Sequence, residues 1–166
     1  MFKLIWQILS IFGDIQFWLG AAVVSLIFFF IIPKKSKKYI AWFVFLILPT
    51  VSIAYFVTYI LKILFKVERP CLGFLECPST YSFPSSHAAV VFAAATAVIL
   101  LYKNKKLAIP LLIISSLVSL SRVMLDYHRF EDIIAGALIG IIVGIIIERV
   151  YRTHNKEIAE IITKIK

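Results

Sequence analysis

Residues 133–151 read IIAGALIGIIVGIIIERVY, and this stretch decides the class of the fold. Its apolar part is close to the ~20 residues that a helix needs to cross the hydrocarbon core of a bilayer. Gly136, Gly140 and Gly144 recur at every fourth position, so they share one face of such a helix. Small residues at this spacing let another helix approach closely, which predicts packing inside a bundle, with a dimer contact as the alternative.

Four further apolar segments precede this one, and polar loops separate them. The 166 residues are 61% hydrophobic with a mean hydropathy of +0.96, whereas ordinary soluble domains are roughly 45–50% apolar. We therefore predict an all-α integral membrane protein with a bundle of about five transmembrane helices in residues 15–151, within a single domain over 1–166. The expected spans are Ile15–Ile32, Tyr39–Leu61, His87–Tyr102, Leu107–Leu125 and Ile133–Tyr151.

The two ends of the chain differ from these spans. Residues 1–13 are too few to cross a bilayer and mix Lys3, Trp6 and Gln7 with Leu and Ile, which predicts an interfacial helix. No small-residue cleavage site follows it, so we expect the segment to remain in the mature protein. Residues 152–166 carry Ile at helical spacing, which predicts an amphipathic cytoplasmic tail, with a frayed solvated tail as the alternative.

The 18 Lys and Arg residues indicate how the chain crosses the membrane. Most of them lie in PKKSKK, in KNKK and after the last span, which are the segments on one side of the predicted bundle. This side is expected to be cytoplasmic, because cytoplasmic loops carry an excess of Lys and Arg. The N-terminus is then outside and the C-terminus inside. Nucleic acid is not expected as a partner of the +9 charge, since the charges lie in short loops between spans.

Cys71 and Cys77 are the only cysteines, and both fall in the outer loop between the second and third spans. An even number of cysteines in an oxidising compartment favours a disulfide, and Gly73 would help so short a loop to bend. A metal site is the weaker interpretation, because the two thiols lack partners that would complete a tetrahedral set of ligands.

A polar stretch, SRVMLDYHRFED at residues 121–132, separates the last two spans at their outer ends. His128 and Asp132 are four residues apart, so on a helix they share one face. An Asp that accepts a hydrogen bond from one ring nitrogen leaves the other nitrogen free to attack, as in an activated nucleophile. The plainer alternative is that Asp132 only favours the start of the last span through the helix dipole.

Three cations are expected at the same outer ends as these two residues. They are Lys62 and Arg69 in KILFKVERP, and Arg122 at the start of the polar stretch. The planar fork of Arg matches phosphate oxygens in pairs, and Lys acts as a point charge. Interface anchoring is the usual role of such residues, but anchors need no histidine on two separate spans.

The segment FPSSHA supplies the second histidine at the start of the third span. Ser85 and Ser86 are expected to open that helix, and a helix N-terminus is an anion-binding site. His87 can protonate a leaving oxygen near neutral pH, because its ordinary pKa is ~6.5. Together with the cations, these residues predict a phosphate site, although a lone His at a helix start is more often a packing residue.

These clusters resemble the motifs K-x6-RP, P-S-G-H and S-R-x5-H-x3-D of the type-2 phosphatidate phosphatase and vanadium haloperoxidase superfamily. Lys62 and Arg69-Pro70 fit the first motif, and residues 121–132 fit the third in full. Residues 84–87 read PSSH, so Ser86 stands where the family usually has Gly, whose small size allows close backbone approach. The spans favour the membrane lipid phosphatase branch, because haloperoxidases are soluble and much larger.

The resemblance implies phosphate-ester hydrolysis without a metal or other cofactor. It implies that His128 is the nucleophile and forms a phosphohistidine, that Asp132 orients it, and that His87 is the acid for the leaving group. The phosphate-binding residues implied by the resemblance are Lys62, Arg69, Ser85, Ser86 and Arg122.

An outward phosphate site among lipid-facing spans indicates a membrane lipid phosphate as the partner. The first expectation is an isoprenoid diphosphate, such as a dolichyl or undecaprenyl carrier, which is recycled on the outer face after glycan transfer. Phosphatidic acid and phosphatidylglycerophosphate are the alternatives. A non-catalytic protein that binds or moves lipid phosphates is the alternative of another class, because it needs the cations but neither histidine. A homodimer through the glycine ridge is the alternative to packing of that ridge within the bundle.

Overall fold

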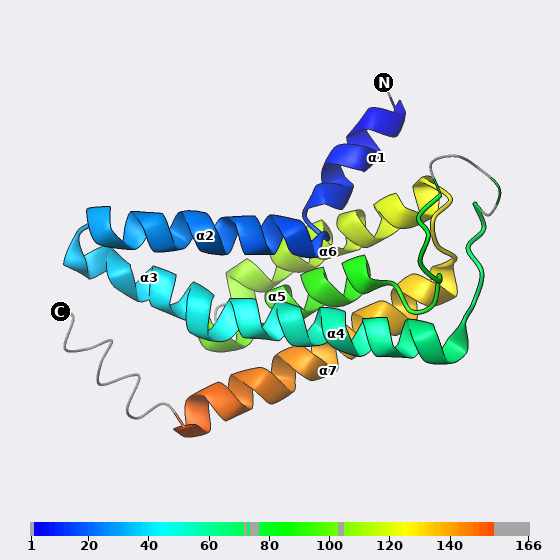
Figure 1. Ribbon diagram of the computed structural model, residues 1–166. Helices are drawn as coiled ribbons and strands as arrows, with labels where there is room; N and C mark the ends of the chain where they lie inside the picture. Colours follow the sequence, from blue (N-terminus) through cyan, green and yellow to red (C-terminus); the bar gives the residue numbers. More distant parts are fainter. Residues whose placement is uncertain (1, 72, 74–76, 103–104, 155–166) are drawn as a thin grey trace.

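The computed structural model describes residues 2–71, 73, 77–102 and 105–154, and every regular element within them is helical (Figure 1). The α-helices are α1 (Phe2–Ile11), α2 (Ile15–Ile31), α3 (Lys37–Trp42), α4 (Leu48–Phe65), α5 (Ser86–Tyr102), α6 (Lys105–Met124) and α7 (Phe130–His154). A 3-10 turn, η1 (Lys34–Ser36), and a π-helical turn, η2 (Phe43–Ile47), flank α3. The predicted all-α class is confirmed.

Helix length and apolarity identify the chain as a multi-pass membrane protein. Among the described residues, the runs Lys34–Phe65, Lys106–Met124 and Phe130–Thr153 are long and apolar enough to cross a bilayer. The α1–α2 pair passes the same test together, bent by 52°. Helix α5 has 17 residues, which gives a length of roughly 25 Å against a hydrocarbon core of ~30 Å. All five predicted spans are therefore helical, and those formed by α2 and α5, with 17 residues each, are the shortest.

The second predicted span is one helical run from α3 to α4 with a widened turn inside it. The π-helical turn η2 directly precedes α4, and Pro49 is the second residue of α4. Pro has no N–H to donate, and its ring clashes with the carbonyl one turn back in a regular helix. A local widening of this kind relieves the clash without ending the helix.

Helix α5 lies in the centre of the bundle and contacts α4, α6 and α7. The glycine ridge of α7 allows the closest of these contacts. A Cβ at Gly136 would overlap the carbonyl oxygen of Ser85, and one at Gly140 would overlap that of Ala89. A Cβ at Gly144 would lie 2.8 Å from the side chain of Thr96. The ridge therefore packs within the bundle, as predicted. Its close contacts determine the position of α5 along the axis of α7.

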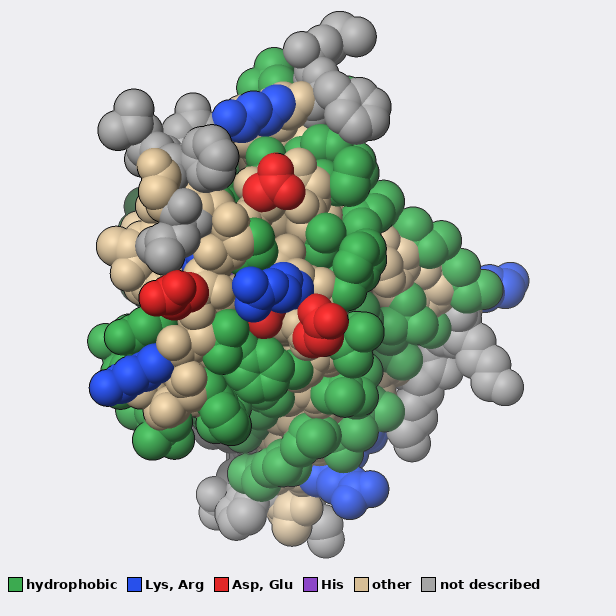
Figure 2. All heavy atoms as spheres, turned by 90° about the vertical axis from the view of Figure 1, so that its right-hand side faces the viewer, with side chains coloured by type: hydrophobic (Ala, Val, Ile, Leu, Met, Phe, Trp, Pro, Cys, Tyr) green, Lys and Arg blue, Asp and Glu red, His purple; other side chains and the backbone are tan. Residues whose placement is uncertain are grey.

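The connecting segments gather at two opposite ends of the bundle. Figure 1 shows the α4–α5 loop and the α6–α7 turn at one end, and the α2–α3 turn and the end of α7 at the other. All three sequence motifs thus reach one end, which we call the motif end. Figure 2 faces this end and shows charged side chains set in a largely apolar surface. The assignment of the motif end to the outside of the cell stays a prediction.

Helix α1 is helical as predicted, but it also packs against α6. The α1–α2 turn, residues 12–14, lies beside His87 near the start of α5. The location of α1 at the membrane interface stays a prediction. Most of the predicted tail, residues 155–166, lies outside the described residues, and α7 itself continues through His154.

Candidate active site

His128 lies in the turn between α6 and α7, and the backbone of that turn determines where its ring lies. The N–H groups of Tyr127 and His128 donate to the carbonyl of Arg122 at 3.0 and 3.2 Å. Asp126 has a φ of 57°, a left-handed conformation that Asp tolerates better than most residues. Asp126 is thus an exposed residue at which the backbone turns toward His128.

Asp132 serves both the start of α7 and the ring of His128. Its Oδ2 accepts the backbone N–H of Arg129 at 2.8 Å, in the manner of a capping box. The same oxygen lies 3.4 Å from Nδ1 of His128 and accepts the hydroxyl of Ser82. Asp132 therefore has both of the roles that the sequence offered as alternatives. It stabilises the start of α7, and it contacts His128.

Contacts on both sides of the His128 ring determine which nitrogen carries the hydrogen. Nε2 lies 3.1 Å from Nη1 of Arg69, and a guanidinium can only donate. Nδ1 faces the carboxylate of Asp132, which can only accept. Burial, reinforced by Arg69 and opposed by Asp132, lowers the pKa of His128 to about 3. The ring is therefore neutral, with its hydrogen on Nδ1 and a lone pair on Nε2.

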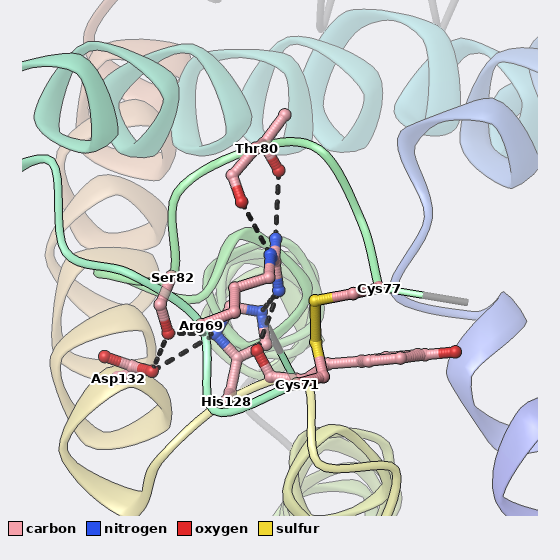
Figure 3. Close-up of a disulfide and its surroundings, with 8 residues drawn as sticks. Arg69, Cys71, Cys77, Thr80, Ser82, His128 and Asp132 are labelled. Atoms are coloured by element: carbon pink, nitrogen blue, oxygen red, sulfur yellow. Dashed lines mark hydrogen bonds and ion pairs between the residues drawn. A yellow bond between two sulfur atoms is a disulfide. The ribbon is translucent and has the colours of Figure 1, made fainter. Parts of the chain in front are cut away.

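Arg69 is bound from two loops (Figure 3). Its Nε and Nη2 donate to the carbonyl and the hydroxyl of Thr80 at 2.6 and 2.9 Å. Its Nη1 donates to the carbonyl of Tyr127 at 2.8 Å. Cys71 and Cys77 form a disulfide beside it, with Cα atoms 5.5 Å apart. This bridge closes the loop that follows Arg69, so it limits how far the guanidinium can move.

Lys62 and Arg122 complete a set of buried cations. Lys62 is 5% exposed, and its Nζ donates to the carbonyls of Tyr81 and Ser82, both at 2.7 Å. Arg122 donates to the hydroxyl of Ser10 in α1 and lies over the ring of Tyr127 at 4.7 Å. Its Nε is buried and lacks a hydrogen-bond partner within the described ranges. Buried cations that contact neutral groups strongly favour an anion beside them.

A pocket of about 260 Å³ brings these groups together. The predicted site residues on its wall are Lys62, Arg69, Ser86, His87, Arg122 and His128. Cations around one cavity, with two histidines in its wall, suit the binding of a phosphate group and attack on its phosphorus.

Ser85 and Asp132 lie behind this wall. Ser85 is fully buried, and its N–H donates to the carbonyl of Asp132 at 2.9 Å, which joins the start of α5 to α7. The structure thus does not place Ser85 on the pocket surface, where the sequence predicted it. Ser86 begins α5 on the pocket wall, and the hydroxyl of Thr58 donates to its Oγ at 2.9 Å.

Several residues that contact the site residues were not predicted from the sequence. Ser82 bonds to Asp132, and no spacing rule links these two positions. Asp14, in the α1–α2 turn, has its Oδ1 3.0 Å from Nε2 of His87. A Cβ at Gly13 would lie 2.7 Å from the ring of His87, so only Gly fits there without a shift. For the two contacts with His87, the Gly13-Asp14 pair between two apolar segments was the available signal in the sequence.

Comparison with known proteins finds a family model and curated relatives that match this chain. Residues 43–156 match the family model described as PAP2 superfamily. Dolichyldiphosphatase 1 from Dictyostelium discoideum is 31% identical over 111 residues, which are 58% of this chain and 48% of the relative. Decaprenylphosphoryl-5-phosphoribose phosphatase from Mycobacterium tuberculosis is 30% identical over 102 residues, 59% of this chain and 55% of the relative. The chain thus spans about half the length of the curated relatives it matches.

Two solved structures share the helical arrangement. A PAP2-type phosphatidylglycerolphosphate phosphatase from Bacillus subtilis superposes with a TM-score of 0.73 at 20% identity, covering 93% of this chain and 78% of the other. Aquifex aeolicus LpxE superposes with a TM-score of 0.60 at 26% identity, covering 87% and 84%. At this identity the first likeness concerns the fold alone.

Proposed function

This chain belongs to the PAP2 superfamily, and from that premise we propose that it removes phosphate from a membrane lipid phosphate or diphosphate through a phosphohistidine at His128. The observation that carries this proposal is the state of the His128 ring. Nε2 holds a lone pair toward Arg69 at the wall of a pocket, and Nδ1 is held by Asp132. A binding protein would need the cations but not a histidine prepared in this way.

The first step is transfer of the phosphoryl group to His128. Lys62, Arg69 and Arg122 offset the charge of the phosphate oxygens. Nε2 of His128 forms a bond to phosphorus while the bond from phosphorus to the leaving oxygen breaks. His87 gives its proton to that oxygen, and the Asp132 carboxylate stabilises the charge that develops on the His128 ring.

The second step is hydrolysis of the phosphohistidine. Water attacks phosphorus and the bond to Nε2 breaks, so His128 regains its lone pair. His87, now neutral, takes the proton of the attacking water and returns to its initial state. Phosphate leaves, and the two steps use only water and side chains that the structure brings to the pocket.

The first substrate candidate is an isoprenoid diphosphate on the outer face of the membrane. Both matched relatives are named for polyprenyl substrates, a dolichyl diphosphate and a decaprenyl-linked sugar phosphate. The pocket wall also includes Tyr55 and Tyr59 of α4, whose neighbour Phe56 is 61% exposed on an apolar helix face. A lipid chain can therefore stay beside the helices while its phosphate lies in the pocket.

The test is phosphate release by purified protein in detergent with a chelator present. Isoprenyl diphosphate, phosphatidic acid and phosphatidylglycerophosphate are offered in parallel. We expect release from isoprenyl diphosphate that persists in chelator and falls at least about 10³-fold in His128→Ala. Arg129→Ala is the matched control, because Arg129 is an exposed neighbour of His128 outside the pocket wall.

Two outcomes would redirect the proposal. Preference for phosphatidic acid or phosphatidylglycerophosphate would keep the mechanism and change the substrate. Lipid binding without release from any of the three lipids would support the binding or transport alternative.

A further inference from the structure

One wall of the pocket is formed by an N-terminal segment that lies outside the residues matched by the family model. Residues 43–156 match the family model, whereas Gly13, Asp14 and the start of α2 line the pocket from the N-terminal side. Asp14 is the only carboxylate on the pocket wall among the described residues. Three further contacts hold this segment in place.

These contacts connect the N-terminal segment to both His87 and Arg122. Gly13 packs so closely on the ring of His87 that a Cβ there would lie 2.8 Å from the Cβ of His87. Ser10 accepts a hydrogen bond from Nη1 of Arg122. Trp18 of α2 donates to the carbonyl of Phe12 at 3.0 Å, which closes the α1–α2 turn. Asp14 is therefore fixed beside His87.

Asp14 is the anionic partner of His87. Its Oδ1 lies 3.0 Å from Nε2, and the side chain of His87 is 15% exposed while that of Asp14 is 50% exposed. The contact is close but not aligned as a hydrogen bond, and Nε2 has no aligned partner in the described part of the chain. The N–H of Nε2 thus stays available to a leaving oxygen while the carboxylate stabilises the ring from the side.

The other charged groups around His87 would oppose its protonation. The titratable and charged groups that face His87 across the pocket are Asp14, Lys62, Arg69, Arg122, His128, Tyr55 and Tyr59. Apart from Asp14, the charged groups among them are the cations Lys62, Arg69 and Arg122. A general acid in this pocket must keep its proton beside them, and a carboxylate at 3.0 Å favours the protonated ring.

We propose that Asp14 is a positioning residue of the active site, which orients His87 and favours its protonated form, the acid for the leaving group. This inference rests on the proposed function. In the first step the proton passes from Nε2 of His87 to the leaving oxygen as the bond to phosphorus breaks, and Asp14 stays ionised throughout. In the second step His87 regains a proton from the attacking water.

The basicity of the leaving group determines how strongly loss of Asp14 slows phosphate release. Hydrolysis of a phosphate monoester releases an alkoxide, which needs a proton, whereas hydrolysis of a diphosphate releases a phosphate, a much weaker base. Loss of Asp14 is therefore expected to slow release from phosphatidic acid more than release from isoprenyl diphosphate. A purely structural role would reduce both by the same factor.

The test compares Asp14→Asn and Asp14→Glu with wild type, with both lipids and across pH. For Asp14→Asn we expect kcat on the preferred lipid to fall about 10- to 100-fold with KM within about 3-fold. The limb of the kcat profile that requires protonated His87 should move to lower pH. Asp14→Glu should restore part of kcat, since it restores the carboxylate. The thermal midpoint in detergent should stay within a few degrees of wild type.

Glu131→Gln is the matched control, because Glu131 is an exposed carboxylate of α7 outside the pocket wall. Its kcat and pH profile should equal those of wild type. An Asp14→Asn protein with wild-type kcat and pH profile would overturn the inference while the proposed function stands. Absence of phosphate release by wild type from every lipid would overturn both, because no acid would then be needed.

Discussion

The two ends of the bundle carry positive charge in opposite ways. At the motif end Lys62, Arg69 and Arg122 are at most 7% exposed and donate to carbonyl and hydroxyl groups. At the other end Lys34 and Lys35 are exposed in the α2–α3 turn. Burial of a charge costs free energy unless a partner offsets it, whereas an exposed Lys costs almost nothing. Buried cations thus indicate a site built for an anion, and exposed ones indicate only orientation in the membrane.

The largest expected effect comes from removing a buried cation. Arg69→Met takes away the donors to Thr80, Tyr127 and His128, and with them the charge that faces the phosphate. We expect phosphate release to fall about 10³-fold, and the free energy of unfolding to fall by only about 1–3 kcal/mol, because a buried charge disappears together with its bonds. Phosphate release and thermal unfolding in detergent measure the two effects.

Arg69→Lys is the control for this prediction. It keeps the charge but loses the planar fork, so it should recover only part of the activity. An Arg69→Met protein with more than a tenth of wild-type activity would show that burial of this cation serves the fold and not the site.

The glycine ridge of α7 runs between the two ends and can separate their roles. Gly136→Ala crowds the carbonyl of Ser85 at the start of α5, and Gly144→Ala crowds Thr96 further along. Each should lower the free energy of unfolding by about 1–3 kcal/mol, through overpacking. Only Gly136→Ala should also lower kcat, by about 10-fold, because it displaces the residues that open α5.

Gly20→Ala is the matched control for the ridge. A Cβ at Gly20 meets no atom within 4 Å, and the residue is inside α2. Replacement by Ala should leave activity unchanged and raise the free energy of unfolding by roughly 0.5–1 kcal/mol. Equal loss of kcat in Gly136→Ala and Gly144→Ala would contradict the separation of the two ends.

The buried histidine predicts how stability depends on pH. The pKa of His128 is lowered to about 3 in the folded chain, chiefly by burial. The unfolded chain takes up this proton near pH 6.5, so folded protein loses stability as pH falls below that value. The slope is about 1.4 kcal/mol per pH unit between roughly pH 6 and 4. The thermal midpoint of wild type should therefore fall more steeply with decreasing pH over this window than that of His128→Gln. Equal pH dependence of the two midpoints would refute the prediction.

The smallest effect is expected at the other end of the bundle. Lys34→Gln and Lys35→Gln together should change the free energy of unfolding by less than about 0.5 kcal/mol and leave phosphate release unchanged. Their exposed side chains should matter only for orientation during insertion. Measurable loss of activity in the purified double variant would show that the two ends are coupled.

The sequence by itself determined the features that depend on local spacing. Apolar segments near the length of a bilayer predicted the helices, because backbone groups in lipid must be satisfied within the helix. The four-residue interval between His128 and Asp132 predicted their contact, and the glycine interval predicted a packing ridge. The cations Lys62, Arg69 and Arg122 were predicted to meet because they lie near span ends on one side.

Only the tertiary structure decided which segments enclose the site. Ser10 and Arg122 are 112 residues apart, and Ser82 and Asp132 are 50 apart, so no helical or strand period relates them. The bend between α1 and α2 brings Asp14 to His87, and the bond from Ser85 to Asp132 turns Ser85 away from the pocket. These contacts depend on how helices pack side by side, which residue spacing along one helix does not encode.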